Sequence, residues 1–169
     1  FLDDKSVKML AVEAGGKGIH KVKGKFQHAA RFHGGKVGVV EGFKSYFLQN
    51  EDGQIEETYS VSAGLDYSGV GPQLAYLHDT GRVEFTYATD SEAIEAYKLL
   101  AKTEGIFAAL ESAHAIAGVM KLAPKLGKNK KIVVNCSGRG DKDIFIVTKV
   151  LKDEKFREFL KNKLKTWEE

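Results

Sequence analysis

Ser137 is the residue whose setting points most directly to ligand binding. It follows residues 131–134, a β-branched run without polar alternation that predicts a parallel strand covered on both faces. Ligands of open α/β sheets bind in the crevice outside the carboxyl ends of the strands, so we expect the Ser137 hydroxyl to face that crevice. The glycines of Gly138-Arg139-Gly140 add backbone amides that suit an anion. The alternative is a serine that only satisfies backbone groups at a strand end.

Two carboxylates are further candidates for chemistry. Glu111 lies in a stretch of small and apolar residues, where a carboxylate is costly to bury unless it is paired, hydrogen-bonded or protonated. His114 stands three positions later on the same helical face, so a structural Glu–His pair is the competing explanation. Asp66 lies in the glycine-rich segment 62–72, and loops of that length without regular structure are often functional. An ordinary turn role is the alternative for Asp66.

Alternating strand and helix patterns predict the elements that position these residues, in an α/β fold with a largely parallel sheet. Thr89 and Glu92 form the sequence signature of a capping box at the start of one helix. Asp52-Gly53 predicts a turn between the extended arms 37–49 and 54–59. We expect further strands at 7–12 and 82–88, and helices at 72–77, 106–122 and 143–151, with a last helix that presents Phe156, Leu160, Leu164 and Trp167 on one face.

Composition is that of an ordinary globular domain, with 43% hydrophobic and 29% charged residues, and by itself it indicates no function. The single cysteine, Cys136, excludes an internal disulfide; we expect a buried thiol and a reducing, cytosolic setting. No apolar run approaches the roughly 18 residues of a membrane span. The start at Phe1 has neither an initiator Met nor a signal-peptide pattern, which agrees with a truncated chain.

The net charge of +3 includes a basic cluster between residues 20 and 36. Basic clusters can mark nucleic-acid contact, so a noncatalytic module that binds nucleic acid or an acidic partner through this loop is the alternative function. The cluster is rich in glycine and lacks interleaved aromatic residues for base stacking, which favours a surface loop. Its members are His20, Lys21, Lys23, Lys25, His28, Arg31, His33 and Lys36.

Three motifs in matching order and spacing resemble the tryptophan synthase β chain family, whose members are pyridoxal-phosphate (PLP) enzymes of fold type II. The resemblance covers nearly all of this chain but only the C-terminal part of the family's chain. It implies a three-layer α/β/α architecture with a mostly parallel sheet, in which residues 1–169 form a single, truncated C-terminal PLP-binding domain. The motifs are 135–143, 62–67 and 110–115, supported by 51–55 and 69–72.

The resemblance assigns three residues to the cofactor. It places Ser137 at the PLP ring nitrogen, Glu111 beside the ring and Gly138 in the binding segment. A hydroxyl partner lets a pyridine nitrogen stay neutral, whereas a carboxylate keeps it protonated. Such restraint suits β-replacement better than transamination.

The resemblance also implies roles for the loop residues. Asp66 matches an aspartate that holds the hydroxyl of substrate serine when the site closes. The backbone carbonyls of Tyr67 and Gly69 match a monovalent-cation site (Na or K), although Ser68 replaces the usual proline. Val40 and Glu41 align with the lining of an indole tunnel, but a charged Glu41 would be costly in an apolar passage and is expected to point to solvent instead.

The implied reaction condenses indole with L-serine to L-tryptophan and water. The implied partners are the tryptophan synthase α chain and a second β chain, with no nucleic acid, no membrane and a cytoplasmic location. The family also needs a Schiff-base lysine and a glycine-rich phosphate loop, and neither motif is recognised here. Lys17, Lys44 and Lys142 lack the family's His-Lys context, so we expect the isolated chain to be inactive.

Overall fold

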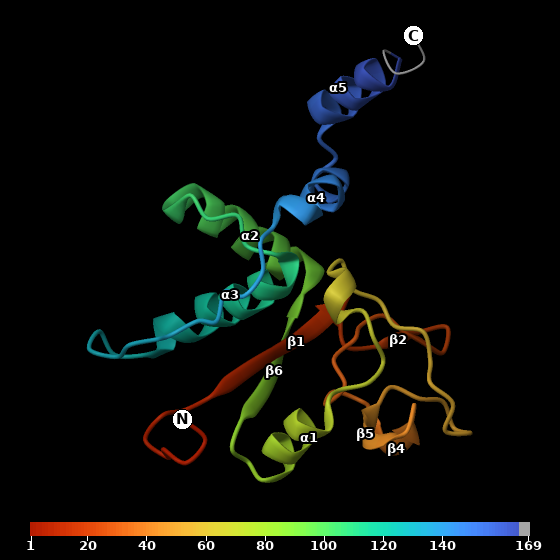
Figure 1. Cartoon of the computed structure of the whole chain (residues 1–169), viewed down its shortest axis with the longest axis vertical. Coiled ribbons are helices and arrows are strands. Elements are labelled where there is room, and N and C mark those ends of the chain that lie inside the picture. The colour runs from red at the N-terminus through yellow and green to blue at the C-terminus, as the bar shows by residue number, and fades with distance from the viewer. Residues whose placement is uncertain (166–169) are drawn as a thin grey trace.

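The computed structural model describes residues 1–165, and its centre is a pair of parallel strands (Figure 1). Strand β1 (Leu10–Gly16) pairs with β6 (Glu84–Thr89) from Leu10 opposite Glu84 to Ala14 opposite Ala88. Helices α2 (Asp90–Glu104) and α3 (Leu110–Leu122) pack against each other and against both strands. The predicted α/β class with a parallel sheet is therefore confirmed.

The start of α2 is fixed by the predicted capping box. The Thr89 side chain accepts the Glu92 amide, and the Glu92 carboxylate accepts the Thr89 amide at 2.8 Å. The helix ends at Gly105, whose φ of 68° is a conformation that glycine adopts without steric cost. Two apolar clusters then join the helices to the rest of the chain: one contains Val61, Ile94, Tyr97, Leu110, Ala113 and Val147, and the other Ala88, Ala96 and Ala117.

Two antiparallel hairpins follow β1 and precede β6 in chain order. They are β2 (Lys21–Val22) with β3 (Lys25–Phe26), and β4 (Lys36–Val40) with β5 (Phe43–Phe47). The hairpin predicted between 37–49 and 54–59 was therefore wrong in its arms. Glu41 and Gly42 both have positive φ, as a two-residue turn with the strands' own twist requires, so the chain reverses within the first arm. The turn at Gly53 exists, but it closes only the isolated bridge between Gln49 and Ile55.

The predicted strand at 131–134 does not form in this structure. β-branched residues favour extended backbone, but a strand also needs a partner, and no ladder within residues 1–165 includes this segment. Val133 is 96% exposed as a result. Cys136, expected to be a buried thiol on that strand, is exposed for the same reason.

The remaining helices are α1 (Pro72–Asp79), α4 (Ile144–Val150) and α5 (Glu154–Lys165), with short 3-10 turns at Ala63–Leu65, Ala123–Lys125 and Asp141–Asp143. Helix α5 projects away from the body of the molecule (Figure 1). The predicted position of Trp167 lies outside the described residues. No helix within residues 1–165 combines the length and apolar character of a membrane span.

Candidate active site

The N-terminal end of α3 holds the segment that follows Ser137. The Ala109 amide donates to the carbonyl of Gly138 at 2.8 Å, and the Gly140 amide donates to the carbonyl of Phe107, also at 2.8 Å. Residues 106–109 are thus extended alongside this segment, which explains why α3 begins at Leu110 and not at the predicted 106.

Side chains reinforce this junction. The Gly138 amide donates to Ser112 Oγ at 3.3 Å. Asp143 is only 2% exposed, and its Oδ2 accepts the Leu110 amide at 2.9 Å, which satisfies a free donor at the start of α3. A Cβ on Gly138 would lie 2.8 Å from the Ala109 Cβ, so this close approach requires glycine. The backbone next to Ser137 is therefore fixed on α3.

Glu111 joins this segment to the loop that carries Asp66. Its Oε1 accepts the Gly64 amide and its Oε2 accepts Lys142 Nζ, each at 2.9 Å. Partial burial would raise the pKa of the Glu111 carboxyl, but hydrogen bonds from Lys142, from the backbone amides of Glu111 and Gly64 and from Ser62 together lower it to about 2. Glu111 is consequently an ionised carboxylate at neutral pH.

Lys142 completes the connection. Besides Glu111, its Nζ contacts Asp143 Oδ1 at 2.7 Å. Burial would lower the Lys142 pKa, but the hydrogen bonds to these two carboxylates outweigh it and the pKa is raised. Neither the ion pairs of Lys142 nor the capping role of Asp143 was predicted from the sequence, where Lys142 was only a candidate for the Schiff-base lysine. An acidic residue at the start of the helix predicted at 143–151 would indicate a cap on that helix, whereas Asp143 satisfies the amide of Leu110, 33 positions away, which no local signal predicts.

His114 does not form the structural pair with Glu111 that the spacing allowed. Its Nδ1 lies 2.7 Å from the Leu110 carbonyl, one turn earlier, and its ring is fully buried. Burial lowers the His114 pKa, although that hydrogen bond and the charges of Asp90 and Glu111 oppose the effect. His114 is therefore a neutral core residue.

Ser137 is exposed, and its hydroxyl has no hydrogen-bond partner among residues 1–165. It adjoins Gly138, which α3 holds. Asp66, two residues after Gly64, is also exposed, and its Oδ1 accepts the Thr58 hydroxyl at 2.8 Å. Glu111 is thus on α3 itself. Gly138, next to Ser137, contacts α3 at Ser112, and Gly64, two residues before Asp66, contacts α3 at Glu111.

The other predicted site residues lie farther along the loop and on the β4–β5 hairpin. The Tyr67 carbonyl accepts an N–H from Arg31 Nη1 at 3.4 Å, and its hydroxyl donates to Glu41 Oε2 at 2.8 Å. Gly69 forms an isolated bridge with Phe47. Glu41 is exposed in the β4–β5 turn, as its charge predicted, and Val40 beside it is half-buried.

The chain contains one His-Lys pair, His20-Lys21, which was not among the lysines considered for the Schiff base. Lys21 lies on β2, and its Nζ pairs with Glu56 at 3.0 Å and sits 4.0 Å from the centre of the Phe26 ring. The Lys21 Nζ is thus already engaged by the chain's own groups, which does not suit an attacking lysine.

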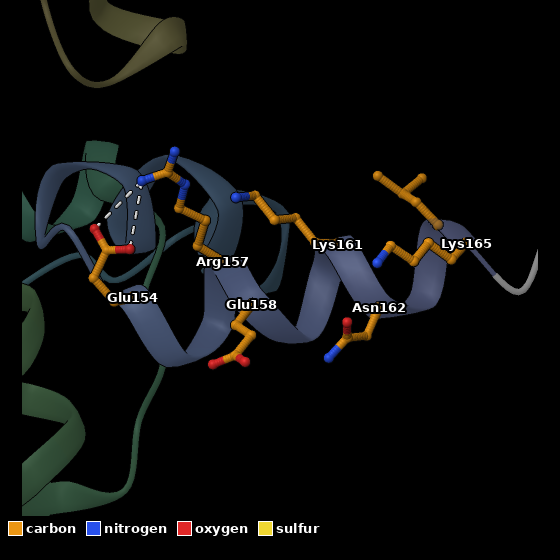
Figure 2. A pocket seen from close by; sticks show the side chains of 7 residues that line it. Glu154, Arg157, Glu158, Lys161, Asn162 and Lys165 are labelled. Atoms are coloured by element: carbon orange, nitrogen blue, oxygen red, sulfur yellow. Dashed lines mark hydrogen bonds and ion pairs between the residues drawn. The ribbon is translucent and has the colours of Figure 1, made fainter.

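The surface hollows along α4 and α5 do not coincide with this site. One follows α5 alone, and Figure 2 shows its side chains projecting from a single helix, with Glu154 and Arg157 paired beside Lys161. The lining side chains are mostly charged and project from opposite sides of this one helix, without a wall from another element. The hollow therefore has no features of a binding site.

Residues 37–138 match the family model described as pyridoxal-phosphate dependent enzyme. The chain belongs to this family. Its relatives include the tryptophan synthase beta chain of Ruegeria pomeroyi, 55% identical over 151 residues, which cover 89% of this chain and 36% of the relative. Tryptophan synthase beta chain 1 of Chlamydia caviae is 56% identical over 144 residues, 85% of this chain and 34% of the relative. The resemblance predicted from the motifs is confirmed, and the chain spans about a third of the length of these relatives.

Proposed function

We propose that this chain forms one wall of a PLP site in an enzyme that condenses indole with L-serine to L-tryptophan and water. The observation that carries this proposal is the free, exposed hydroxyl of Ser137 on a segment fixed beside the ionised Glu111. The proposal is also supported by the identity of about 55% between this chain and the tryptophan synthase beta chain of Ruegeria pomeroyi.

The donor chemistry of these residues fits PLP. A serine hydroxyl can donate to a neutral pyridine nitrogen, and Gly138, which packs closely on Ala109, holds the neighbouring Ser137 in place. PLP, when bound, supplies the electron sink on which replacement at the β-carbon of serine depends. Glu111 would stand beside the ring as a fixed negative charge, since Lys142 and Gly64 hold it in place.

Asp66 would bind the hydroxyl of the substrate serine. Its carboxylate is exposed and accepts only Thr58 within the described residues, so it has acceptor capacity left for a substrate. Its loop is linked to Glu111 through Gly64, so substrate contact at Asp66 can be transmitted to the cofactor wall. Closure of this loop would exclude water from the reacting carbon.

The finer parts of the assignment are also proposals. We propose a tryptophan synthase α chain and a second β chain as partners, a cytoplasmic location, and a Schiff-base lysine and phosphate loop in other parts of the complete protein. The 169-residue chain alone should then form no tryptophan. A monovalent cation (Na or K) at the carbonyls of Tyr67 and Gly69 stays a prediction.

The alternative, a nucleic-acid or acidic-partner module, has no support. Ion pairs occupy part of the basic cluster: Lys21 with Glu56, Lys25 with Glu57, and Arg31 with Glu13. Cations neutralised by the chain's own carboxylates have less capacity to bind phosphates. The matched relatives are biosynthetic enzymes by name.

The test is Ser137→Ala in the complete protein, with the exposed Ser6→Ala as the matched control. Loss of one hydrogen bond to the ring nitrogen should slow tryptophan formation by about tenfold, or about 1.4 kcal/mol, while PLP stays bound through its other contacts. The measurements are PLP content and the initial rate of tryptophan formation. An unchanged rate in Ser137→Ala would refute the assignment.

A further inference from the structure

Glu13 on β1 is a buried anchor for the loop that follows the first hairpin. Its side chain is 4% exposed, and it accepts the backbone amides of Arg31 at 2.7 Å and Phe32 at 3.1 Å. His33 Nδ1 lies 3.3 Å from the same carboxylate. A buried carboxylate with several donors is held in one position, so the backbone at Arg31 is fixed relative to the sheet.

The Arg31 guanidinium extends from this anchor to the loop that carries Asp66. Its side chain is 11% exposed, with Nε 3.5 Å from Glu13 Oε1. Nη1 donates to the carbonyls of Leu65 at 3.3 Å and Tyr67 at 3.4 Å, and also to the carbonyl of Ala29. These loop carbonyls flank Asp66 on both sides. One positive group therefore collects backbone carbonyls from two separate segments.

We propose that Arg31 is a positioning residue whose guanidinium supplies, from within the chain, the positive charge that orders the Asp66 loop. The inference rests on the proposed function, because the value of ordering this loop lies in presenting Asp66 to substrate.

The same contacts argue against a monovalent cation at the predicted position. A cation binds where several oxygens converge without a competing donor, and the Tyr67 carbonyl already faces a guanidinium. A second positive charge at the Tyr67 carbonyl would lie next to the Arg31 guanidinium and would be repelled by it. The carbonyl predicted to hold Na or K thus serves the guanidinium instead.

The test compares potassium chloride with tetramethylammonium chloride at equal ionic strength, using the complete protein loaded with PLP. Tetramethylammonium is too large for a site built from backbone carbonyls, and its methyl groups keep the carbonyl oxygens from coordinating the charged nitrogen. The variant is Arg31→Met, which keeps an apolar side chain of similar length. The matched control is Arg82→Met, because Arg82 also donates to backbone carbonyls, those of Leu2 and Asp4, but far along the chain from the loop. The readouts are the thermal unfolding midpoint without substrate and the rate of tryptophan formation.

For the wild type, the unfolding midpoint should be the same in both salts, and the rates of tryptophan formation in the two salts should agree to within about twofold. The same should hold for Arg82→Met. Arg31→Met should unfold earlier in tetramethylammonium and regain stability in potassium, with a rate difference of about tenfold between the salts. A wild type that needs potassium as strongly as Arg31→Met, or an Arg31→Met variant indifferent to the salt, would overturn the inference. The wild-type comparison decides even if Arg31→Met does not fold. A complete protein that binds PLP but makes no tryptophan would instead count against the proposed function, while the unfolding midpoints would still test Arg31.

Discussion

Replacing Glu111 by glutamine should loosen the site without disturbing the helix that carries it. Glutamine has the shape of glutamate, and its carbonyl can still accept the Gly64 amide. Its NH2 group, however, would face Lys142 Nζ, which now lies 2.9 Å from a carboxylate oxygen. The substitution therefore removes the charge that joins the segment after Ser137 to α3, and little else.

The magnitude follows from the lowered pKa. A carboxyl whose pKa falls from 4.5 to about 2 gains at most about 3 kcal/mol from its native surroundings. The side chains of Glu111 and Lys142 are 26% and 51% exposed, so solvent screening reduces the effect to about 1–2 kcal/mol. Glu95→Gln is the matched control, because Glu95 pairs with Lys98 on the exposed face of α2 and should cost only about 0.3 kcal/mol.

The assay is urea unfolding at several pH values. Because the folded pKa of Glu111 is depressed, its stabilisation is complete above about pH 4.5 and is lost as the pH falls toward about 2. The gap in unfolding free energy between wild type and Glu111→Gln should thus be widest at pH 7 and narrow by about half near pH 3. A gap that stays constant with pH, or one no larger than that of Glu95→Gln, would refute this account of Glu111.

Three further predictions concern the helix cap, the buried histidines and the substrate loop. Thr89→Ala should lower the unfolding free energy by about 1 kcal/mol, since it breaks the capping box of α2, and urea unfolding of the variant and the wild type measures the difference. Burial lowers the pKa of His28 and of His114, despite opposing charges. The stability that the two neutral rings contribute is therefore present above about pH 6.5 and declines as the pH falls from there toward their folded pKa values. The thermal unfolding midpoint should drop when the pH is lowered from 7.5 to 5, and it should drop less in His114→Gln. In the complete protein, Asp66→Ala should reduce the apparent affinity for L-serine and the rate of tryptophan formation while PLP content stays constant; normal kinetics would leave Asp66 a turn residue.

Local signals predicted the elements whose stability is local. The capping box at Thr89 and the glycine stop at Gly105 depend on a few neighbouring residues, so the bounds of α2 followed from the sequence. The strand at 131–134 failed because a strand also needs a partner, and β-branched composition cannot say whether one is present. The hairpin prediction was wrong for a related reason. Glu41-Gly42 and Asp52-Gly53 both favour a turn, and the strand ladder forms around the first of them.

The candidate site divides in the same way. Glu111 was predictable, because a carboxylate in an apolar helix demands a partner, but the partner was not. Lys142 is 31 positions away, and only the folded chain brings it to Glu111. The Arg31 contacts with the Asp66 loop are equally distant in sequence, so a basic cluster could be read only as a surface loop. The roles of these residues are proposals drawn from the motif resemblance, whereas the structure gives the contacts between them.

The central claim is that Ser137 faces the PLP ring nitrogen, and the most direct measurement is a crystal structure of the complete, PLP-loaded protein. The account predicts Ser137 Oγ at about 2.7–3.0 Å from that nitrogen, with Gly138 against the ring and Glu111 still paired with Lys142. A ring nitrogen that meets a carboxylate, or that lies more than about 4 Å from Ser137 Oγ, beyond hydrogen-bond range, would contradict the claim.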